Sequence, residues 1–191
     1  MRLWFAVFLA AFFAFGPAAA VGQAKPEIAG VERKLEHLEG NGSRPQPDSA
    51  PTVFTEDEIN AYFAAGKVEL PTGVRSVHFQ AQPGVVTATT QVDFDKLQEG
   101  RSSSNPLLSM FTGVHEAVVV AQAHGSGGVG YVQVDSGSLD GVEIPRFVLQ
   151  LFVEKFLQPK YPGIGLDSKF ALPDRIDTAA VGSHTLTIVQ K

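Results

Sequence analysis

The amino-acid sequence predicts an α+β domain, in which an antiparallel sheet of about six strands packs on one long apolar helix and a shorter N-terminal helix. Three observations support this prediction. A short, well-capped helix opens the folded region, alternating apolar and polar segments joined by tight turns follow it, and a strongly apolar helix precedes the last two strands. No strand–helix–strand repeat is found in the sequence, so a parallel doubly wound sheet is not expected.

The first predicted helix has a clear start signal. Thr55 and Glu58 have the spacing of a capping box, and Phe54 and Ile59 occupy the positions of a hydrophobic staple around it. Ile59 and Phe63 then share one apolar face. Because the helix is short and has a single apolar stripe, we expect it to dock on another element.

Four strands are predicted after this helix, because apolar and polar residues alternate in each. Pro83-Gly84 joins the first pair in the order that a type II turn requires, and a glycine-rich connection at 125–128 joins the second pair. Between the pairs, residues 96–113 are predicted to form a long loop with an apolar segment, Pro106 to Phe111. This segment is either a lid or an insertion without a function of its own. The predicted strands are residues 76–81, 86–94, 114–124 and 129–135.

The most informative element is the predicted helix at residues 146–157, which follows Pro145 and ends at Pro159. Eight of its twelve residues are apolar. Its apolar arc covers roughly 200°, wider than the stripe of an ordinary surface helix. We expect such a helix either to be buried on two sides or to pack on a sheet while also lining a cavity. Two further strands, residues 174–181 and 184–190, complete the domain.

Residues 1–20 are predicted to be a cleavable signal peptide. One basic residue, Arg2, precedes an apolar run at residues 3–15 and a helix-breaking Gly16-Pro17, with cleavage expected after Ala20 or Ala24. The run is shorter than the about 20 apolar residues that span a membrane, although a retained anchor is the alternative. We therefore expect export to the periplasm or cell envelope. Residues 21–52 are predicted to be a flexible polar linker, in which Val31 to Glu39 could form a short charged helix, and residues 53–191 a single α+β domain.

The composition excludes several classes of function. The chain has no cysteine, so disulfides, cysteine-ligated zinc and thiol chemistry are excluded. Its formal net charge is −5 and it has no cluster of Lys and Arg, so nucleic acid is not expected as a partner. No motif indicates a cofactor or a metal ion.

The sequence predicts no enzyme. Asp93 and Asp95 could form a carboxylate pair on a strand, but a solvated strand end is the more ordinary interpretation, and a hydrolase built on them is the weakest hypothesis. Neither a Gly-x-Ser-x-Gly motif nor a phosphate-binding loop occurs. The histidines on or beside predicted strands lack the i, i+4 spacing of a zinc enzyme: His78, His115, His124 and His184.

An excess of apolar surface remains. The two predicted helices and the dry face of the sheet either form a closed core or leave a seam that accepts an acyl chain, since apolar pockets between elements bind such ligands. If the seam is open, nine residues are expected to line it: Ile59, Phe63, Val77, Phe79, Phe147, Val148, Leu151, Phe152 and Phe156.

Four short segments resemble the LmeA-like family of exported bacterial phospholipid-binding proteins. They are residues 54–62 (FTEDEINAY), 73–79 (GVRSVHF), 140–145 (DGVEIP) and 172–176 (LPDRI). The family's fold is similar to half of a tubular lipid-binding (TULIP-like) module. The resemblance covers residues 53–191 in pattern and implies a non-catalytic, lipid-handling role, with phospholipid and the membrane surface as partners. The long loop at 96–113 departs from the family pattern, and no headgroup-binding residue can be carried over.

The leading hypothesis is therefore an exported envelope protein that binds phospholipid or another acyl-chain ligand in the seam between the helix at 146–157 and the sheet. The alternative is a structural or assembly domain of the envelope, with a filled core and no small-molecule ligand.

Overall fold

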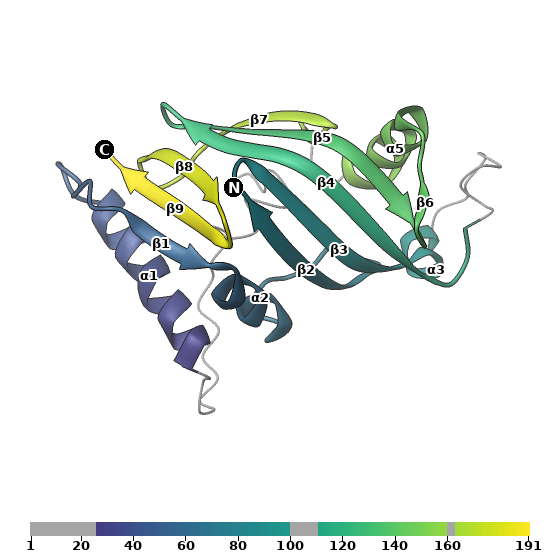
Figure 1. Ribbon diagram of the computed structural model, residues 1–191, viewed down its shortest axis with the longest axis horizontal. Helices are drawn as coiled ribbons and strands as arrows, with labels where there is room; N and C mark the ends of the chain where they lie inside the picture. Colours follow the sequence, from purple (N-terminus) through teal and green to yellow (C-terminus); the bar gives the residue numbers. More distant parts are fainter. Residues whose placement is uncertain (1–25, 100–110, 160–162) are drawn as a thin grey trace.

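The computed structural model describes residues 26–99, 111–159 and 163–191, and within them it is an α+β fold built on one large antiparallel sheet (Figure 1). The predicted fold class is confirmed, although the sheet has nine strands where about six were expected. The helices are α1 (Pro26–Gly42), α2 (Glu56–Ala64), α3 (Phe94–Gln98) and α5 (Arg146–Phe152), the last continued by a π-helical segment, η2 (Val153–Leu157). The strands are β1 (Thr52–Thr55), β2 (Val74–Gln82), β3 (Val85–Asp93), β4 (Val114–Ser126), β5 (Val129–Leu139), β6 (Val142–Glu143), β7 (Asp167–Ala171), β8 (Ile176–Gly182) and β9 (Thr185–Gln190).

The sheet branches at its two longest strands. Its main path runs β1-β9-β8-β4-β3-β2, while β5 pairs with β4 and carries the short strands β6 and β7 on its other edge. Strand β4 pairs with β8 only at His124 and Gly125, so β8 and β9 are joined to the rest of the sheet at one end of β4. Between the pairs Val120–Ser136 and Ala121–Val134, β5 has one extra residue, Asp135, and such a bulge bends its strand. The result is a strongly bent sheet rather than a flat one.

The start of α2 forms as the sequence predicts. The Thr55 Oγ1 atom accepts a hydrogen bond from the Glu58 N–H at 3.2 Å, and the Glu58 Oε2 atom accepts one from the Thr55 N–H at 2.8 Å. Phe54, at the end of β1, is completely buried. The predicted hairpin at Pro83-Gly84 is also present, with Gln82 paired to Val85.

The prediction of a flexible linker at residues 21–52 is wrong for residues 26–42, which form α1. Ile28, Val31, Leu35 and Leu38 repeat at helical spacing and are buried in the core, which identifies α1 as part of the folded domain. The many charged residues between these four positions conceal the stripe. Residues 1–25, which include the predicted signal peptide, lie outside the described residues.

The end of α1 is fixed by a buried polar network. The Asn41 side chain donates a hydrogen bond to the Gln190 Oε1 atom at 2.8 Å and accepts one from the Asp48 N–H at 2.8 Å. The Gln190 Nε2 atom in turn donates to the backbone carbonyls of Leu38 and Asp174. Because these amide groups are buried and mutually satisfied, they fix the position of α1 against the last strand.

The helices lie at two ends of the sheet. In Figure 1, α1 and α2 lie near β1 and β9, whereas α3 and α5 lie near the far ends of β3, β4 and β5. The main closed core belongs to the first end and contains the buried residues of α1, α2, β8 and β9. Two smaller apolar clusters lie at the second end, one around Phe94 and one around Val153. The prediction that residues of both helices line one seam is therefore wrong.

Candidate functional site

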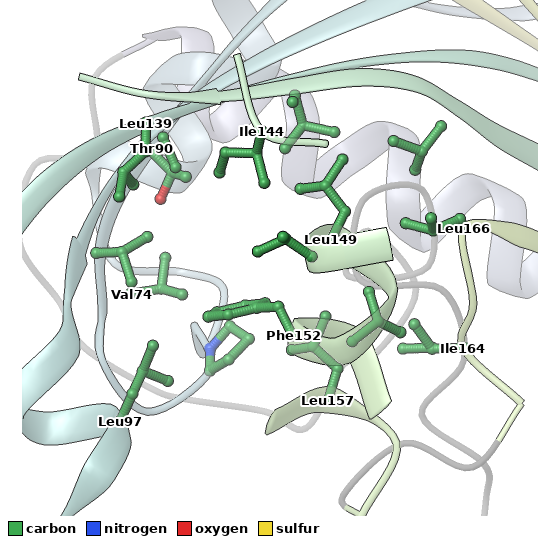
Figure 2. A pocket seen from close by; sticks show the side chains of 18 of the residues that line it. Val74, Thr90, Leu97, Leu139, Ile144, Leu149, Phe152, Leu157, Ile164 and Leu166 are labelled. Carbon is green, nitrogen blue, oxygen red and sulfur yellow. The ribbon is translucent and has the colours of Figure 1, made fainter. Parts of the chain in front are cut away.

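A cavity of about 370 Å³, partly open to the outside, lies between α5 and the sheet. Figure 2 shows Leu149, Phe152 and Leu157 of the helical side projecting towards it, with Thr90 and Leu139 on the sheet side. The volume lies within the range that small-molecule ligand sites occupy. Most of the residues that line it are apolar, and the polar ones are Thr72, Thr90, Lys96, Glu99, Ser138 and Ser168.

Three neighbouring strands form the sheet wall of the cavity. Each contributes residues two apart, which point to the same face of a strand. This is the face on which Ala88 of β3 enters the closed core, so the core and the cavity share one side of the bent sheet. The wall residues are Thr90 and Val92 from β3, Ala117 and Val119 from β4, and Val132 and Val134 from β5.

The helical wall comes from α5 and η2. Val148, Leu149 and Phe152 line the cavity from α5, and Val153 and Leu157 line it from η2. Within Arg146–Phe152 no residue is fully buried, although the segment is mostly apolar. The helical segment and the sheet thus form two walls of one cavity. The π-helical segment lies at the cavity, a type of irregularity that is frequent at functional sites.

The start of α5 is attached to the strands by Arg146. Its Nη1 atom donates to the carbonyl oxygen of Val134 at 2.8 Å, and its Nη2 atom pairs with the Asp167 carboxylate at 2.9 Å. The end of the helical region is attached by Gln158, whose Nε2 atom donates to the carbonyl oxygen of Ile164 at 2.9 Å. These contacts hold both ends of the helical wall against β5, β7 and the segment before β7.

The hydroxyl groups of two lining residues, Thr90 and Ser168, form hydrogen bonds with the backbone. The Thr90 hydroxyl donates to the Ser76 carbonyl at 2.7 Å, and the Ser168 hydroxyl donates to the Gly165 carbonyl at 3.0 Å while accepting from the Gly165 N–H. A hydroxyl whose hydrogen bond is satisfied by backbone presents little polarity to a ligand. The interior is therefore suited to a hydrocarbon rather than to a polar group.

Among the described residues, charged side chains line the cavity only at the α3 end. Lys96 and Glu99 are exposed there, and next to them Phe94 packs on Phe111 at a centroid distance of 5.3 Å and on Phe152 at 6.0 Å. These aromatic contacts connect α3 to the helical wall. The apolar segment predicted at Pro106–Phe111 lies outside the described residues except for Phe111.

The carboxylates considered for catalysis have structural partners. Asp93 caps α3 by accepting a hydrogen bond from the Lys96 N–H at 3.1 Å and pairs with Arg75 at 2.6 Å; the Arg75 hydrogen bond is the main reason that the pKa of Asp93 is lowered. Asp95 accepts a hydrogen bond from the Gly113 N–H at 3.1 Å. Neither carboxylate lines the cavity.

His115 is placed beside the cavity without lining it. Its Nδ1 atom pairs with the Asp140 carboxylate, its Nε2 atom contacts the Thr112 carbonyl at 2.8 Å, and its ring packs edge-on against Phe94. The hydrogen bond to Asp140 raises the pKa of His115. Among the other histidines, His124 stacks on Tyr131 and His184 contacts Glu56. The described ranges contain no group of three residues that could hold a metal ion.

The structure separates the nine residues predicted to share one seam. Val148 and Phe152 line the cavity, whereas Phe147 is 63% exposed and Leu151 is half-buried without lining it. The side chain of Phe156 lies outside the described part of the chain. Four of the nine belong instead to the closed core at the other end of the sheet: Ile59, Phe63, Val77 and Phe79.

Several lining residues were not predicted. On the helix, Leu149 and Leu157 are ordinary members of the apolar arc, and only the observed rotation of the helix selects them. On the sheet, Thr90 and Val92, like Ala117 and Val119, are two residues apart on one face of a strand, and this pattern in the sequence could have identified them. Ile164 and Leu166 lie in a segment for which no strand was predicted.

Within the described residues, no helix has the length and apolarity needed to cross a membrane. Comparison with known proteins finds no match to any protein-family model, curated protein or solved structure. The resemblance to the LmeA-like family therefore rests on the short segments quoted above.

Proposed function

We propose that this chain is an exported, non-catalytic envelope protein that binds phospholipid or another acyl-chain ligand in the cavity between α5 and the sheet. One observation carries the proposal: a cavity of about 370 Å³ has a largely apolar lining, and one of its walls is a mostly apolar helix, α5, in which no residue is fully buried. Natural interiors are close-packed and seldom keep large voids, so a space of this kind favours an occupant.

The energetics of such a ligand are reasonable. Burying one methylene group contributes about 0.8 kcal/mol, so a chain that buries ten of them gains on the order of 8 kcal/mol before costs. Association and ordering offset much of this gain, and least when the site is already formed. The attachment of the helical wall through Arg146 and Gln158 supplies such a formed site.

The finer assignments belong to this proposal. We regard the fold as similar to half of a tubular lipid-binding module, which the long antiparallel strands and the apolar helix beside the cavity support. Export rests on the pattern of residues 1–20. A non-catalytic role agrees with the structural partners of Asp93 and with the place of His115 outside the cavity.

The test is native mass spectrometry of residues 21–191, purified from a bacterial envelope without detergent, followed by organic extraction. We expect a co-purifying lipid mass in the wild-type protein. Phe152→Asp, which places a carboxylate in the cavity, is expected to lose that mass. Phe147→Asp is the matched control: it makes the same change on the same helix at an exposed position, and it should keep the lipid.

Circular dichroism and thermal unfolding establish that both variants are folded before their masses are compared. A wild-type protein that stays free of lipid, even after incubation with envelope lipids, would contradict the proposal. That result would favour the alternative of a structural or assembly domain.

A further inference from the structure

We infer that the cavity holds a single acyl chain, which enters at the α3 end and places its methyl terminus against Ile164 and Leu166. The ligand class is therefore a monoacyl amphiphile, such as a fatty acid or a lysophospholipid. This inference rests on the proposed function and specifies its ligand.

The first argument is volume. A protein cavity of about 150 Å³ accommodates benzene, which has six carbons, so each carbon needs on the order of 25 Å³. At that density a cavity of about 370 Å³ holds about 15 carbons. This corresponds to one ordinary acyl chain, whereas a diacyl lipid would have to place about twice as many carbons.

The second argument is the direction of polarity along the cavity. Lys96, Glu99 and Thr72 line the α3 end and are all exposed. In Figure 2, Leu97 lies at this end and Leu166 on the opposite side, with Leu149 and Phe152 between them. A polar headgroup is compatible only with the end that has exposed polar and charged side chains.

At the opposite end the described lining residues are buried and mostly apolar. Ile164 is 7% exposed and Leu166 is 4% exposed, and both pack in one cluster with Val153, while Val134 lies against the same cluster. The hydroxyl of Ser168, which also lines this end, is bonded to the backbone of Gly165. An atom that can form no hydrogen bond, such as a terminal methyl group, is the part of a lipid that fits this end.

The headgroup end has one cationic and one anionic lining residue among those that the structure describes, Lys96 and Glu99. Their charges are opposite, so the cavity mouth gives no strong preference for an anionic or a zwitterionic headgroup. The number and length of the acyl chains of a lipid are therefore expected to govern its affinity. Whether the single chain belongs to a fatty acid or to a lysophospholipid is expected to matter less.

The experiment measures lipid binding to residues 21–191 by native mass spectrometry. The probes are saturated fatty acids and lysophosphatidylcholines with chains of 8 to 18 carbons, and diacyl phosphatidylcholines with the same chains. We expect one monoacyl lipid per protein, with affinity rising up to about fourfold per added methylene and levelling near 15 carbons. Diacyl lipids should bind at least tenfold more weakly than monoacyl lipids of equal chain length.

Val134→Phe tests the direction of the chain. It adds four carbons to a side chain near Ile164 and Leu166. The chain length at which affinity stops rising should therefore decrease by about four carbons, while the shortest lipids still bind. Val134→Leu adds one carbon and should produce a shift of about one carbon if the larger variant does not fold. Val120→Phe is the control, because Val120 follows the lining residue Val119 on β4 and so points to the opposite face.

Two lipids per protein, or diacyl binding as tight as monoacyl binding, would overturn the single-chain inference while leaving the proposed function intact. Equal weakening of all chain lengths by Val134→Phe would overturn the proposed direction. Absence of binding by every probe would instead contradict the proposed function itself.

Discussion

Leu149 of α5 lies directly over Gly137 of β5, so closely that a Cβ atom added to the glycine would come within 2.9 Å of the Leu149 Cδ2 atom. The missing side chain therefore sets how near the helix approaches the sheet. Because Leu149 also lines the cavity, the same contact controls the depth of the candidate site.

Gly137→Ala should reduce lipid binding with little change in stability. The flexible end of Leu149 can move into the cavity to make room, and alanine is favoured over glycine in a strand by roughly 0.5–1 kcal/mol. We therefore expect a free energy of unfolding within about 1 kcal/mol of wild type and a several-fold loss of lipid affinity. Urea unfolding and lipid titration of the same preparation check this. A large loss of stability with unchanged affinity would show that Leu149 cannot move.

Arg146→Gln should loosen the start of α5. Both partners of the Arg146–Asp167 pair are more than half exposed, so the ion pair contributes little to stability, about 0–1 kcal/mol. The hydrogen bond to the Val134 carbonyl, however, positions the helix over the cavity. We expect faster hydrogen exchange across 146–152 and faster lipid release, with overall stability nearly unchanged. Asp167→Asn is the control, since it weakens the ion pair and keeps the contact to Val134.

Val31→Asp should unfold the domain, because α1 is part of its core. Val31 is completely buried, and placing a carboxylate there is expected to cost about 3 kcal/mol or more. His37→Asp makes a similar change on an exposed position of the same helix and should change stability by less than about 0.5 kcal/mol. Equal stability of the two variants would mean that α1 is detached in solution.

The His115–Asp140 pair predicts a pH dependence with a defined sign. The hydrogen bond to Asp140, then that to the Thr112 carbonyl and the charges of Asp140 and Asp95, raise the pKa of His115 above that of the unfolded chain. The stabilising contribution of this histidine is therefore fully present below its unfolded pKa, about 6.5, and is lost as the pH rises through the higher folded value.

Asp140 has the opposite sign. The hydrogen bond from His115 lowers the pKa of Asp140, so its contribution is present above its unfolded pKa and is lost as the pH falls through the lower folded value. An NMR titration of the His115 ring should give a raised pKa in the wild-type protein, returning towards the ordinary value in Asp140→Asn. An unchanged pKa in that variant would exclude Asp140 as the cause.

Local signals in the sequence predicted local structure well. The capping box at Thr55 and Glu58 and the turn at Pro83-Gly84 depend only on neighbouring residues, and both formed as expected. Strands β1, β6 and β7 were missed. Strand β6 has only two residues, too few for a periodic signal, β1 has two adjacent apolar residues, Val53 and Phe54, and one of the two buried positions of β7 is the polar Ser168. The stripe of α1 was missed because charged residues separate its apolar positions and a breaker-rich segment follows it.

The site was harder to predict because its position depends on the bending of the sheet. Ala88, Thr90 and Val92 occupy every second position of β3 and point to the same face. Ala88 nevertheless lies in the closed core, whereas Thr90 and Val92 line the cavity. Alternation indicates a face but gives no information on which helix covers which end of it. Phe79 and Phe152 were therefore assigned to one seam although they lie in separate apolar clusters.

The central claim is that an acyl chain lies in the cavity under α5, and Phe152→Trp tests it most directly. The only tryptophan of the sequence is Trp4, so residues 21–191 of this variant carry a single indole reporter in the cavity wall. With a fatty acid brominated near the middle of its chain, we predict saturable quenching of the emission of this indole, and little quenching in the exposed control Phe147→Trp. Equal quenching in both variants, or binding of the fatty acid without quenching in Phe152→Trp, would contradict the account.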